Sequence, residues 1–461
     1  MQDAPDIFAR AAQHAALFRA GLRERRVAPD GDAARLEKAF GDPLPAAGSN
    51  PVAVVDALVR AAEPGLVGTA GPRFFGFVIG GSLPAATAAD MLTSAWDQCA
   101  FNAVLSPAAI AAERAAGGWL KDLLGIPAWS SVGFVTGAQE ANTVGLAAAR
   151  HHVLAVAGWD VARRGLLGGP AVRVVASAER HATIDRSLRL LGLGDDCVEE
   201  VAPDANGAMD MADLARVMGA RDDGPTILCL QAGNVNTGAC DDLVAGCDVA
   251  RQYDAWVHVD GAFGLWAAAS PTTAHLVQGL ERADSWGCDG HKWLNLPYDS
   301  GFAFCAHPQV HAAAVSYTAS YLSGSGEVEP GGADLTLESS RRARGFAAWA
   351  GLRELGRDGV AELVERPCAL ARRFADSLSA RGVEVVNEVV LNQVLVSFGS
   401  DATTDAVIAG VQREGTCWMG GTTWRGRRLM RISVSNWSTT QEDVDASVDA
   451  IMRVRARLRS S

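Results

Sequence analysis

Short apolar runs alternate with helical stretches from about residue 70 to residue 320 of this 461-residue chain. Parallel strands need crossover connections, and helices are the usual form of these connections. The alternation therefore predicts a mainly parallel sheet covered by helices. The strands that we expect are 131–135, 171–177, 226–232, 255–259, 283–287 and 301–305.

The regions on either side of this alternation predict two further parts of the fold. A Gly/Ser/Pro-rich stretch, 323–332, separates the alternating region from the C-terminal part of the chain. We therefore expect an α/β protein with an N-terminal helical segment (1–70), a large domain (71–332) and a smaller α+β C-terminal domain (333–461). The flanking helices that we expect are 6–26, 51–63 and 335–355, and the expected C-terminal strands are 394–398 and 429–434.

Asp260 and Lys292 follow two neighbouring strands of the expected sheet. Asp260 ends the apolar run 255–259, and Lys292 comes just after the next run. Open α/β sheets build ligand sites at the carboxyl ends of their strands, so both side chains should face one crevice. Pyridoxal phosphate needs such a pair, an amine to bond to its aldehyde and a carboxylate for its pyridine nitrogen. For the pair alone, an ordinary surface Asp and a solvated Lys remain the alternative.

The turn after strand 131–135 predicts an anion site. Thr136 and Gly137 lead directly into an Ala/Leu-rich helix, which places Ala138 and Gln139 in its first turn. Free backbone N–H groups and the helix dipole favour a phosphate there. The alternative is an ordinary strand-to-helix turn capped by Thr136. Nucleotide motifs of the Walker or Gly-x-Gly-x-x-Gly type are absent from the sequence.

His181 follows strand 171–177 and begins a helix with Ile184 and Leu188 on its apolar face. An imidazole at such a turn can lie flat on an aromatic cofactor. The alternative is a half-buried histidine that caps the helix.

In order and spacing, His181, Asp260-Gly261-Ala262 and His291-Lys292-Trp293 resemble the pyridoxal-phosphate-dependent group II amino-acid decarboxylases. The segments 72–77 and 337–342 are similar to flanking segments of that family, so the resemblance covers most of the chain. It implies a fold-type I pyridoxal-phosphate enzyme, related to aspartate aminotransferase, whose large domain binds pyridoxal 5'-phosphate.

The resemblance also implies roles for individual residues. Lys292 would hold the cofactor, Asp260 would face its pyridine nitrogen, and His181 and Ala262 would cover its two faces. The residues implied near the phosphate are Ala138, Gln139, Asp289 and His291. Many relatives have Asn in place of Asp289, and a carboxylate there repels phosphate unless a cation or a protonation change intervenes.

The residues expected to meet the substrate are less sharply defined. An Arg fork suits a carboxylate, so Arg431 is a candidate clamp for the substrate carboxylate, with an edge-strand surface arginine as the alternative. Phe77 and Phe101 are candidates for the side-chain pocket, or equally for the core. A metal site built from His258, Asp260 and His291 matches no zinc pattern, so no metal is expected.

The stretch 323–332 corresponds to a family loop that usually carries a tyrosine, the proton donor to the substrate α-carbon. Here that stretch has no tyrosine, and Tyr321 lies just before it. His181 or Lys292 could supply the proton, or Tyr321 could move in. Slow protonation would instead let dioxygen intervene and give aldehyde, ammonia and peroxide.

The function that we expect is decarboxylation of an L-amino acid, possibly aromatic, to its amine and carbon dioxide. The alternatives are an aldehyde-forming oxidative decarboxylase, or another pyridoxal-phosphate reaction such as transamination or carbon–sulfur cleavage. From a different class, a cofactor-binding protein without turnover remains open.

Composition and the resemblance bound the partners and the location. A net charge of −12 without a basic run argues against nucleic acid, and no apolar stretch reaches membrane-spanning length. Nine cysteines without a Cys-x-x-Cys motif, and an N-terminus without signal-peptide features, favour a cytoplasmic protein. A homodimer with sites near its interface is implied by the resemblance and by apolar helix faces at 6–26 and 51–63.

Overall fold

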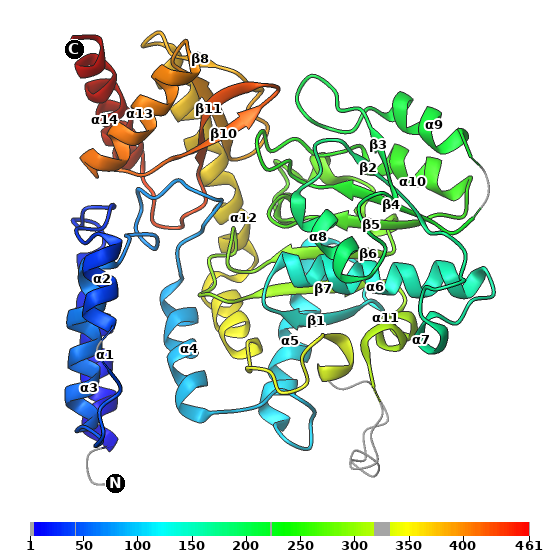
Figure 1. The fold of residues 1–461 in the computed structure, drawn as a ribbon, viewed down its shortest axis with the longest axis horizontal. Helices are drawn as coiled ribbons and strands as arrows, with labels where there is room; N and C mark the ends of the chain where they lie inside the picture. The colour runs from blue at the N-terminus through cyan, green and yellow to red at the C-terminus, as the bar shows by residue number, and fades with distance from the viewer. Residues whose placement is uncertain (1–3, 42, 222–223, 318–331, 461) are drawn as a thin grey trace.

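A seven-stranded sheet forms the centre of the large domain in the computed structural model (Figure 1), which describes residues 4–41, 43–221, 224–317 and 332–460. The strands run in the order β1-β7-β6-β5-β4-β2-β3. Only β7 is antiparallel to its neighbours, so the sheet is mainly parallel, as the sequence predicted. The strand bounds are β1 Ser131–Val135, β2 Arg173–Ser177, β3 Val198–Val201, β4 Thr226–Gln231, β5 Trp256–Asp260, β6 Ser285–Asp289 and β7 Gly301–Cys305.

The central strands form where the chain is apolar on both faces. Every residue of β2, β4, β5, β6 and β7 is buried. Strands covered by helices on both sides read as continuous apolar runs, which explains why the sequence located them. Full burial of a side chain such as Val257 or Val259 contributes about 1.5–3 kcal/mol to the free energy of unfolding.

Helices cover both faces of this sheet, and others build the N-terminal segment and the small domain. Helix α6 packs along β5, β6 and β7, while the long α12 packs on α4 and α5. The helix bounds are α1 Ala4–Gly21, α2 Ala33–Phe40, α3 Pro51–Ala62, α4 Pro84–Trp96, α5 Pro107–Leu124, α6 Ala138–Val156, α7 Val161–Arg164, α8 Ala182–Leu190, α9 Met211–Gly219, α10 Leu243–Arg251, α11 Pro308–Val315, α12 Gly345–Ser379, α13 Asp401–Glu414 and α14 Gln441–Ser460.

The prediction of a helix over 335–355 is wrong for its first half. The structure has a short 3-10 turn at Gly332–Leu335, then irregular chain, and α12 begins only at Gly345. Arg341 is responsible for much of this difference, because its guanidinium pairs with buried Glu113 at 2.7 Å and also bonds the Phe134 carbonyl. These long-range contacts hold the chain in an extended path.

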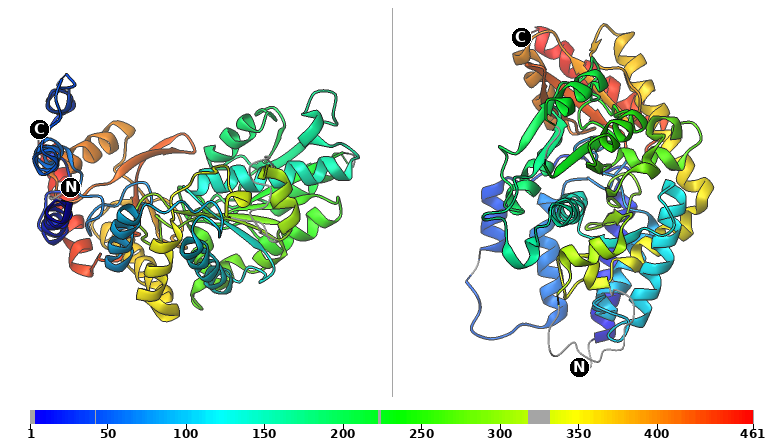
Figure 2. Two further views of the ribbon diagram at one scale, coloured as in Figure 1. Left: turned by 90° about the horizontal axis from the view of Figure 1, so that it is seen from below. Right: turned by 90° about the vertical axis from the view of Figure 1, so that its right-hand side faces the viewer.

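The small domain is built on a second, antiparallel sheet of four strands in the order β10-β11-β9-β8. Seen from below, it lies with the N-terminal helices at one end of the molecule and the large domain at the other (Figure 2). Its core is a separate cluster that includes Phe374, Val396 and Ile432. The strand bounds are β8 Glu384–Val385, β9 Gln393–Ser397, β10 Gly420–Trp424 and β11 Arg427–Ser433.

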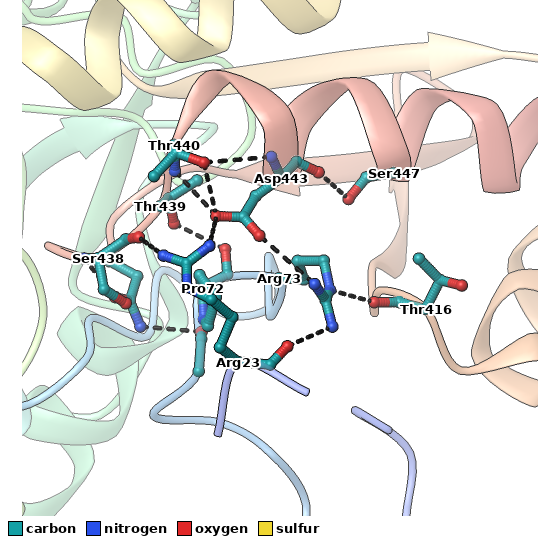
Figure 3. A network of polar contacts seen from close by, with 11 residues as sticks. Arg23, Pro72, Arg73, Thr416, Ser438, Thr439, Thr440, Asp443 and Ser447 are labelled. Carbon is teal, nitrogen blue, oxygen red and sulfur yellow. Dashed lines mark hydrogen bonds and ion pairs between the residues drawn. The ribbon is translucent and has the colours of Figure 1, made fainter. Parts of the chain in front are cut away.

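Asp443, in the first turn of α14, anchors the N-terminal segment to the small domain (Figure 3). Its carboxylate accepts hydrogen bonds from Arg23 Nη1 at 3.1 Å and Arg73 Nη1 at 3.5 Å. It also accepts from the Thr440 backbone N–H at 3.0 Å, while Thr440 Oγ1 accepts from the Asp443 N–H at 3.4 Å, a reciprocal cap of the helix. Only 3% of the Asp443 side chain is exposed, so this junction is a buried ion-pair cluster.

Candidate active site

Four strand ends meet at one edge of the large sheet. Asp260 is the last residue of β5 and Asp289 the last of β6. Beside them, β1 leads through Gly137 into α6, and β2 leads to His181. The sequence predicted this convergence, because parallel strands place their carboxyl ends at the same edge.

Lys292 and Asp289 form an ion pair at the N-terminus of α6. Lys292 Nζ lies 2.9 Å from Asp289 Oδ2. The other oxygen, Oδ1, accepts a hydrogen bond of 2.5 Å from the Ala138 backbone N–H, the first of the helix. In this structure the lysine is therefore the cationic partner of the Asp289 carboxylate.

His291 lies against the same carboxylate, with Nε2 at 3.2 Å from Asp289 Oδ1. Its Nδ1 accepts a hydrogen bond from the Ser300 N–H at 3.1 Å, so the proton of the neutral ring sits on Nε2. Burial lowers the pKa of His291, and the charge of Asp289 opposes this. Tyr298 stacks on the imidazole, with ring centroids 4.4 Å apart.

His181 caps α8, and charged groups of the site act on the pKa of its ring. Its Nδ1 accepts the Thr183 N–H at 3.2 Å, which leaves the ring proton on Nε2. Burial lowers the pKa of His181 most strongly. The charges of Asp260 and Asp289 oppose this lowering, whereas those of Lys292 and Arg431 add to it.

Asp260 is 5% exposed at the end of β5. Its Oδ1 accepts a weak hydrogen bond from the Ala262 N–H at 3.2 Å, and the Ala262 carbonyl accepts from the Asp289 N–H at 3.0 Å. Ala262 therefore bridges the two strand ends that carry the carboxylates.

The turn between β1 and α6 packs closely on two residues of the site. A Cβ atom on Gly137 would lie 2.8 Å from His291 Cε1 and 3.0 Å from Asp289 Oδ1, so only glycine lets these side chains approach the turn. Next to it are the α6 N-terminus and the Lys292 amine, and the Asp260 carboxylate lies at the neighbouring strand end. An anion site, an amine and a buried carboxylate at one sheet edge fit pyridoxal phosphate.

Arg431 reaches the site from β11 of the small domain. Its Nη1 donates to the Val235 carbonyl at 3.1 Å, and burial lowers the pKa of its guanidinium. The sequence alternative of an exposed edge-strand arginine is wrong, because β11 lies between β9 and β10 and the side chain is largely buried.

Other predicted site residues lie farther from this cluster or in different roles. The Gln139 amide donates to Ser187 Oγ at 2.9 Å, so its side chain joins α6 to α8. Phe77 is 60% exposed and packs 5.3 Å from the ring of Trp418. The Phe101 carbonyl accepts the Ala333 N–H, and no described contact joins Phe101 to Lys292. Tyr321 lies outside the described residues.

His258, which was weighed above as a metal ligand, is fully buried within β5. Its Nδ1 lies 2.8 Å from Ser285 Oγ and its Nε2 3.1 Å from Asn142 Oδ1. Burial lowers the pKa of His258 to about 3, so the ring is neutral. In the ranges that the structure describes, no cluster of three His, Cys, Asp or Glu side chains is arranged for a metal ion.

Sequence reasoning missed two residues that contact the cluster or its neighbours. Tyr298 stacks on His291, and its place only six positions after Lys292 was a usable signal. Glu179 lies two positions before His181 and bonds the small domain at Trp424, a contact that no local pattern could reveal.

Comparison with known proteins identifies the family of this chain. The family model described as "Pyridoxal-dependent decarboxylase conserved domain" matches residues 45–399. The chain is 30% identical over 415 residues to tryptophan decarboxylase 1 of Oryza sativa subsp. japonica, covering 82% of this chain and 79% of that protein. It is 25% identical over 455 residues to an aromatic-L-amino-acid decarboxylase of Bacillus atrophaeus, covering 94% and 91%.

A solved structure shares the fold. The crystal structure of Oryza sativa TDC with PLP and tryptamine superposes with a TM-score of 0.91 at 24% identity, over 99% of this chain and 98% of that one. This chain belongs to the pyridoxal-dependent decarboxylase family. It is a carboxy-lyase of fold type I that uses pyridoxal 5'-phosphate to decarboxylate an amino acid. No described helix is both long and apolar enough to cross a membrane.

Proposed function

We propose that Lys292 holds the cofactor covalently, that Asp260 keeps its pyridine nitrogen protonated, and that Arg431 binds the substrate carboxylate. The observation that carries this assignment is the shared sheet edge, where Asp260 ends β5, the Lys292–Asp289 ion pair follows β6 and His181 follows β2, with Arg431 held on the Val235 carbonyl beside it. Ala138, His291 and Asp289 would frame the phosphate end. His181 and Ala262 would lie against the ring.

Bound pyridoxal phosphate supplies the electron sink for the electrons of the broken Cα–carboxylate bond. The chain's own groups orient the reaction. Arg431 is a charged fork in a buried setting, which fixes a carboxylate more firmly than a solvated lysine would. When His181 is protonated on both ring nitrogens, it can deliver a proton to the substrate α-carbon and return to the neutral ring.

An aromatic or bulky apolar L-amino acid is the substrate class that we propose. Segment 76–81 passes directly beside Lys292, because a Cβ atom on Gly80 would lie 2.0 Å from the Lys292 carbonyl oxygen. The second residue of this segment, Phe77, packs on Trp418, which also stacks on Phe74. Two of the similar proteins named above act on tryptophan or aromatic amino acids.

Amine is the main product that we propose, and aldehyde is the second candidate. The aldehyde reading rests on the tyrosine-free stretch 323–332 and on similarity to the phenylacetaldehyde synthase of a Rosa hybrid cultivar, 27% identical over 68% of this chain and 63% of that protein. Parallel assays of amine, aldehyde and peroxide, with and without oxygen, separate the two. Peroxide formed in equal amount to carbon dioxide by the unmodified protein would establish the aldehyde route.

Carbon dioxide release from a panel of the common L-amino acids tests the substrate class. We expect the fastest release from an aromatic member. Fastest release from an acidic amino acid or from 2,4-diaminobutyrate would overturn the aromatic proposal and leave the decarboxylase assignment intact.

Borohydride reduction tests the cofactor lysine with little ambiguity, because the chain has only three lysines, Lys38, Lys121 and Lys292. We expect peptide mapping to find the reduced cofactor on Lys292 alone. The matched control is Lys121, which donates to the Ala128 and Ser130 carbonyls and should stay unmodified. In the same assay Asp260→Asn should keep the cofactor but lose most turnover, and near wild-type rates would remove its role.

A homodimer is the assembly that we propose. Large apolar side chains are exposed on α1 and α3, among them Phe8, Leu17 and Leu58. Covering such faces with a second copy removes them from water. Light scattering that finds an active monomer at assay concentration would contradict this.

A cytoplasmic location is the last part of the proposal. All nine cysteines are free, and Cys229, Cys288 and Cys417 are among the buried ones. Reduced, buried cysteines are typical of cytoplasmic proteins. Recovery of the activity in a membrane or secreted fraction would contradict it.

A further inference from the structure

Glu179 lies where the large and small domains meet beside the site. It sits in the turn after β2, two positions before His181, and its side chain is 16% exposed. Its Oε2 accepts hydrogen bonds from Trp424 Nε1 at 2.8 Å and Asn234 Nδ2 at 3.3 Å. Its Oε1 accepts from Arg425 Nε at 3.3 Å. Three donors from two other segments therefore converge on one carboxylate.

The first of these segments is the loop 233–238 after β4. Asn234 is fully buried, and its Oδ1 accepts the Asn236 and Thr237 N–H groups at 2.9 and 3.2 Å, which fixes the loop's shape. Between them, the Val235 carbonyl accepts Arg431 Nη1 at 3.1 Å. Glu179 thus holds, through Asn234, the loop that orients the Arg431 guanidinium.

The second segment is the β10–β11 hairpin, which carries Arg431 itself. Trp424 and Arg425 lie at its turn, and Gly420 pairs with Arg431 at its other end. Midway along β10, Thr422 Oγ1 donates to Asn236 Oδ1 at 2.8 Å. Both routes from Glu179, through the loop and through the hairpin, end at Arg431.

The energetic weight lies with the buried neutral donors. An ion pair such as Glu179–Arg425, with the arginine 39% exposed, contributes only about 0–1 kcal/mol. Trp424 is 6% exposed, and the carboxylate is the described acceptor of its Nε1 N–H. Asn234 is fully buried and shares its Nδ2 between the carboxylate and the Gly207 carbonyl, each at 3.3 Å. A glutamine of the same size cannot satisfy all three donors, because its amide replaces one acceptor oxygen with a donor.

We propose that Glu179 is a positioning residue that sets the affinity for the substrate carboxylate, by holding Arg431 in fixed relation to His181. The proposal rests on the proposed role of Arg431 as the carboxylate clamp. It concerns only the carboxylate end of the substrate. The phosphate end of the proposed cofactor site lies at the ends of β1 and β6, and Glu179 has no described contact with Ala138, Asp289 or Lys292 there.

The test compares Glu179→Gln holoenzyme with the unmodified enzyme. The probes are the fastest amino acid of the decarboxylation panel and its own amine, which lacks the carboxylate. We expect KM for the amino acid to rise about 10-fold, in the range that small misplacements of a positioning group cause. The inhibition constant of the amine and the dissociation constant of pyridoxal phosphate should change less than twofold.

Hydrogen exchange supplies a readout that does not depend on turnover. In Glu179→Gln, amides of 233–238 and 420–431 should exchange faster, with the rest of the protein unchanged. Trp424→Phe, which removes one donor and keeps a large apolar ring, should shift KM and exchange in the same direction. It serves as the second variant if Glu179→Gln folds poorly.

Glu384→Gln is the matched control. Glu384 pairs with Arg427, which lies opposite Trp424 in the same hairpin, but holds it to β8. This variant should leave KM unchanged. Unchanged KM and exchange in Glu179→Gln would overturn the proposal, as would equal weakening of amino acid and amine. Arg431→Gln separates the role of Arg431 from the role of Glu179. If it raises KM while Glu179→Gln does not, Arg431 binds the substrate carboxylate but Glu179 does not position it. If Arg431→Gln has no effect, the clamp itself is wrong.

Discussion

Glu179 and Asp443 are two carboxylates that tie the small domain to the rest of the molecule. Each accepts hydrogen bonds from arginine and from neutral donors. The neutral donors to Glu179 lie on other segments, whereas the neutral donor to Asp443 is Thr440, just before α14. They differ in what they hold. Asp443 holds Arg23 and Arg73 of the N-terminal region (Figure 3), neither of which belongs to the site. Glu179 holds two segments that both lead to Arg431.

The difference teaches that similar junctions have different functions when the segments they fix differ. Asp443 is more deeply buried, at 3% exposure against 16% for Glu179. Its loss should therefore affect folding more. Loss of Glu179 should affect substrate binding more, because a site group lies at the end of each segment that it holds.

The largest expected effect is at Arg431, to which both segments held by Glu179 lead. Arg431→Gln should lower kcat/KM about 100- to 1,000-fold, equivalent to about 3–4 kcal/mol, because the substrate carboxylate loses its charged partner. Steady-state kinetics and urea unfolding measure the effect and its specificity. Arg428→Gln, on the same strand but paired with exposed Asp405, is the control and should behave as the unmodified enzyme.

Asp443→Asn should show the opposite pattern, with stability lowered and KM unchanged. We expect a loss of about 2–3 kcal/mol in the free energy of unfolding, because Arg23 and Arg73 lose a buried anionic partner. Urea unfolding at neutral pH gives the stability, and kinetics at a temperature where the variant is folded give KM. If KM of the fully folded variant were raised, Asp443 would affect substrate binding as Glu179 does, and the proposed difference between them would be wrong.

The effect of His258 on stability must be measured apart from the effects of Glu179 and Asp443, because His258 acts in acid. Its pKa falls from 6.5 to about 3 on folding. Between these values the unfolded chain binds a proton there and the folded chain does not, so stability falls as the pH falls. This contributes about 1.4 kcal/mol per pH unit.

Unfolding midpoints in urea from pH 6 to 4.5 measure this slope. His258→Gln should flatten it by about that amount, whereas His275→Gln, at an exposed position, should not. An unchanged slope in His258→Gln would mean that other groups cause the loss of stability in acid.

The smallest effect is expected at Glu384. Its pair with Arg427 is about half exposed on both sides, so Glu384→Gln should cost less than about 0.5 kcal/mol of stability. Thermal unfolding detects a larger loss. A loss comparable to that of Asp443→Asn would mean that burial does not set the difference between the junctions.

The sequence predicted six of the seven strands of the large sheet, because burial leaves apolar runs there, but it missed the edge strand β3, whose sequence is Val-Glu-Glu-Val. It also predicted the convergence of Asp260, Lys292 and His181, since strand direction fixes which ends meet. β10 escaped prediction: Gly420 to Trp424 has a Gly-Gly-Thr-Thr sequence without apolar alternation.

Long-range contacts account for the features of the fold and the site that the sequence did not predict. The contact between Glu179 and Trp424 joins residues 245 positions apart, and nothing near either residue in the sequence reports it. The start of α12 was missed for the same reason, because Arg341 is held by Glu113, 228 positions away. Tyr298 stacks on a histidine only seven positions earlier, yet sequence alone gave no direction for its ring.

The contact between Glu179 and Arg425 spans 246 positions, which also orders the assembly of the site during synthesis. Chains emerge from the ribosome N-terminus first. A nascent chain that ends at residue 400 already contains His181, Asp260 and Lys292, but neither the hairpin nor Arg431. The end of the site that binds the cofactor can therefore form on an unfinished chain. The end that binds the substrate carboxylate can form only after β11, which carries Arg431, has been synthesised.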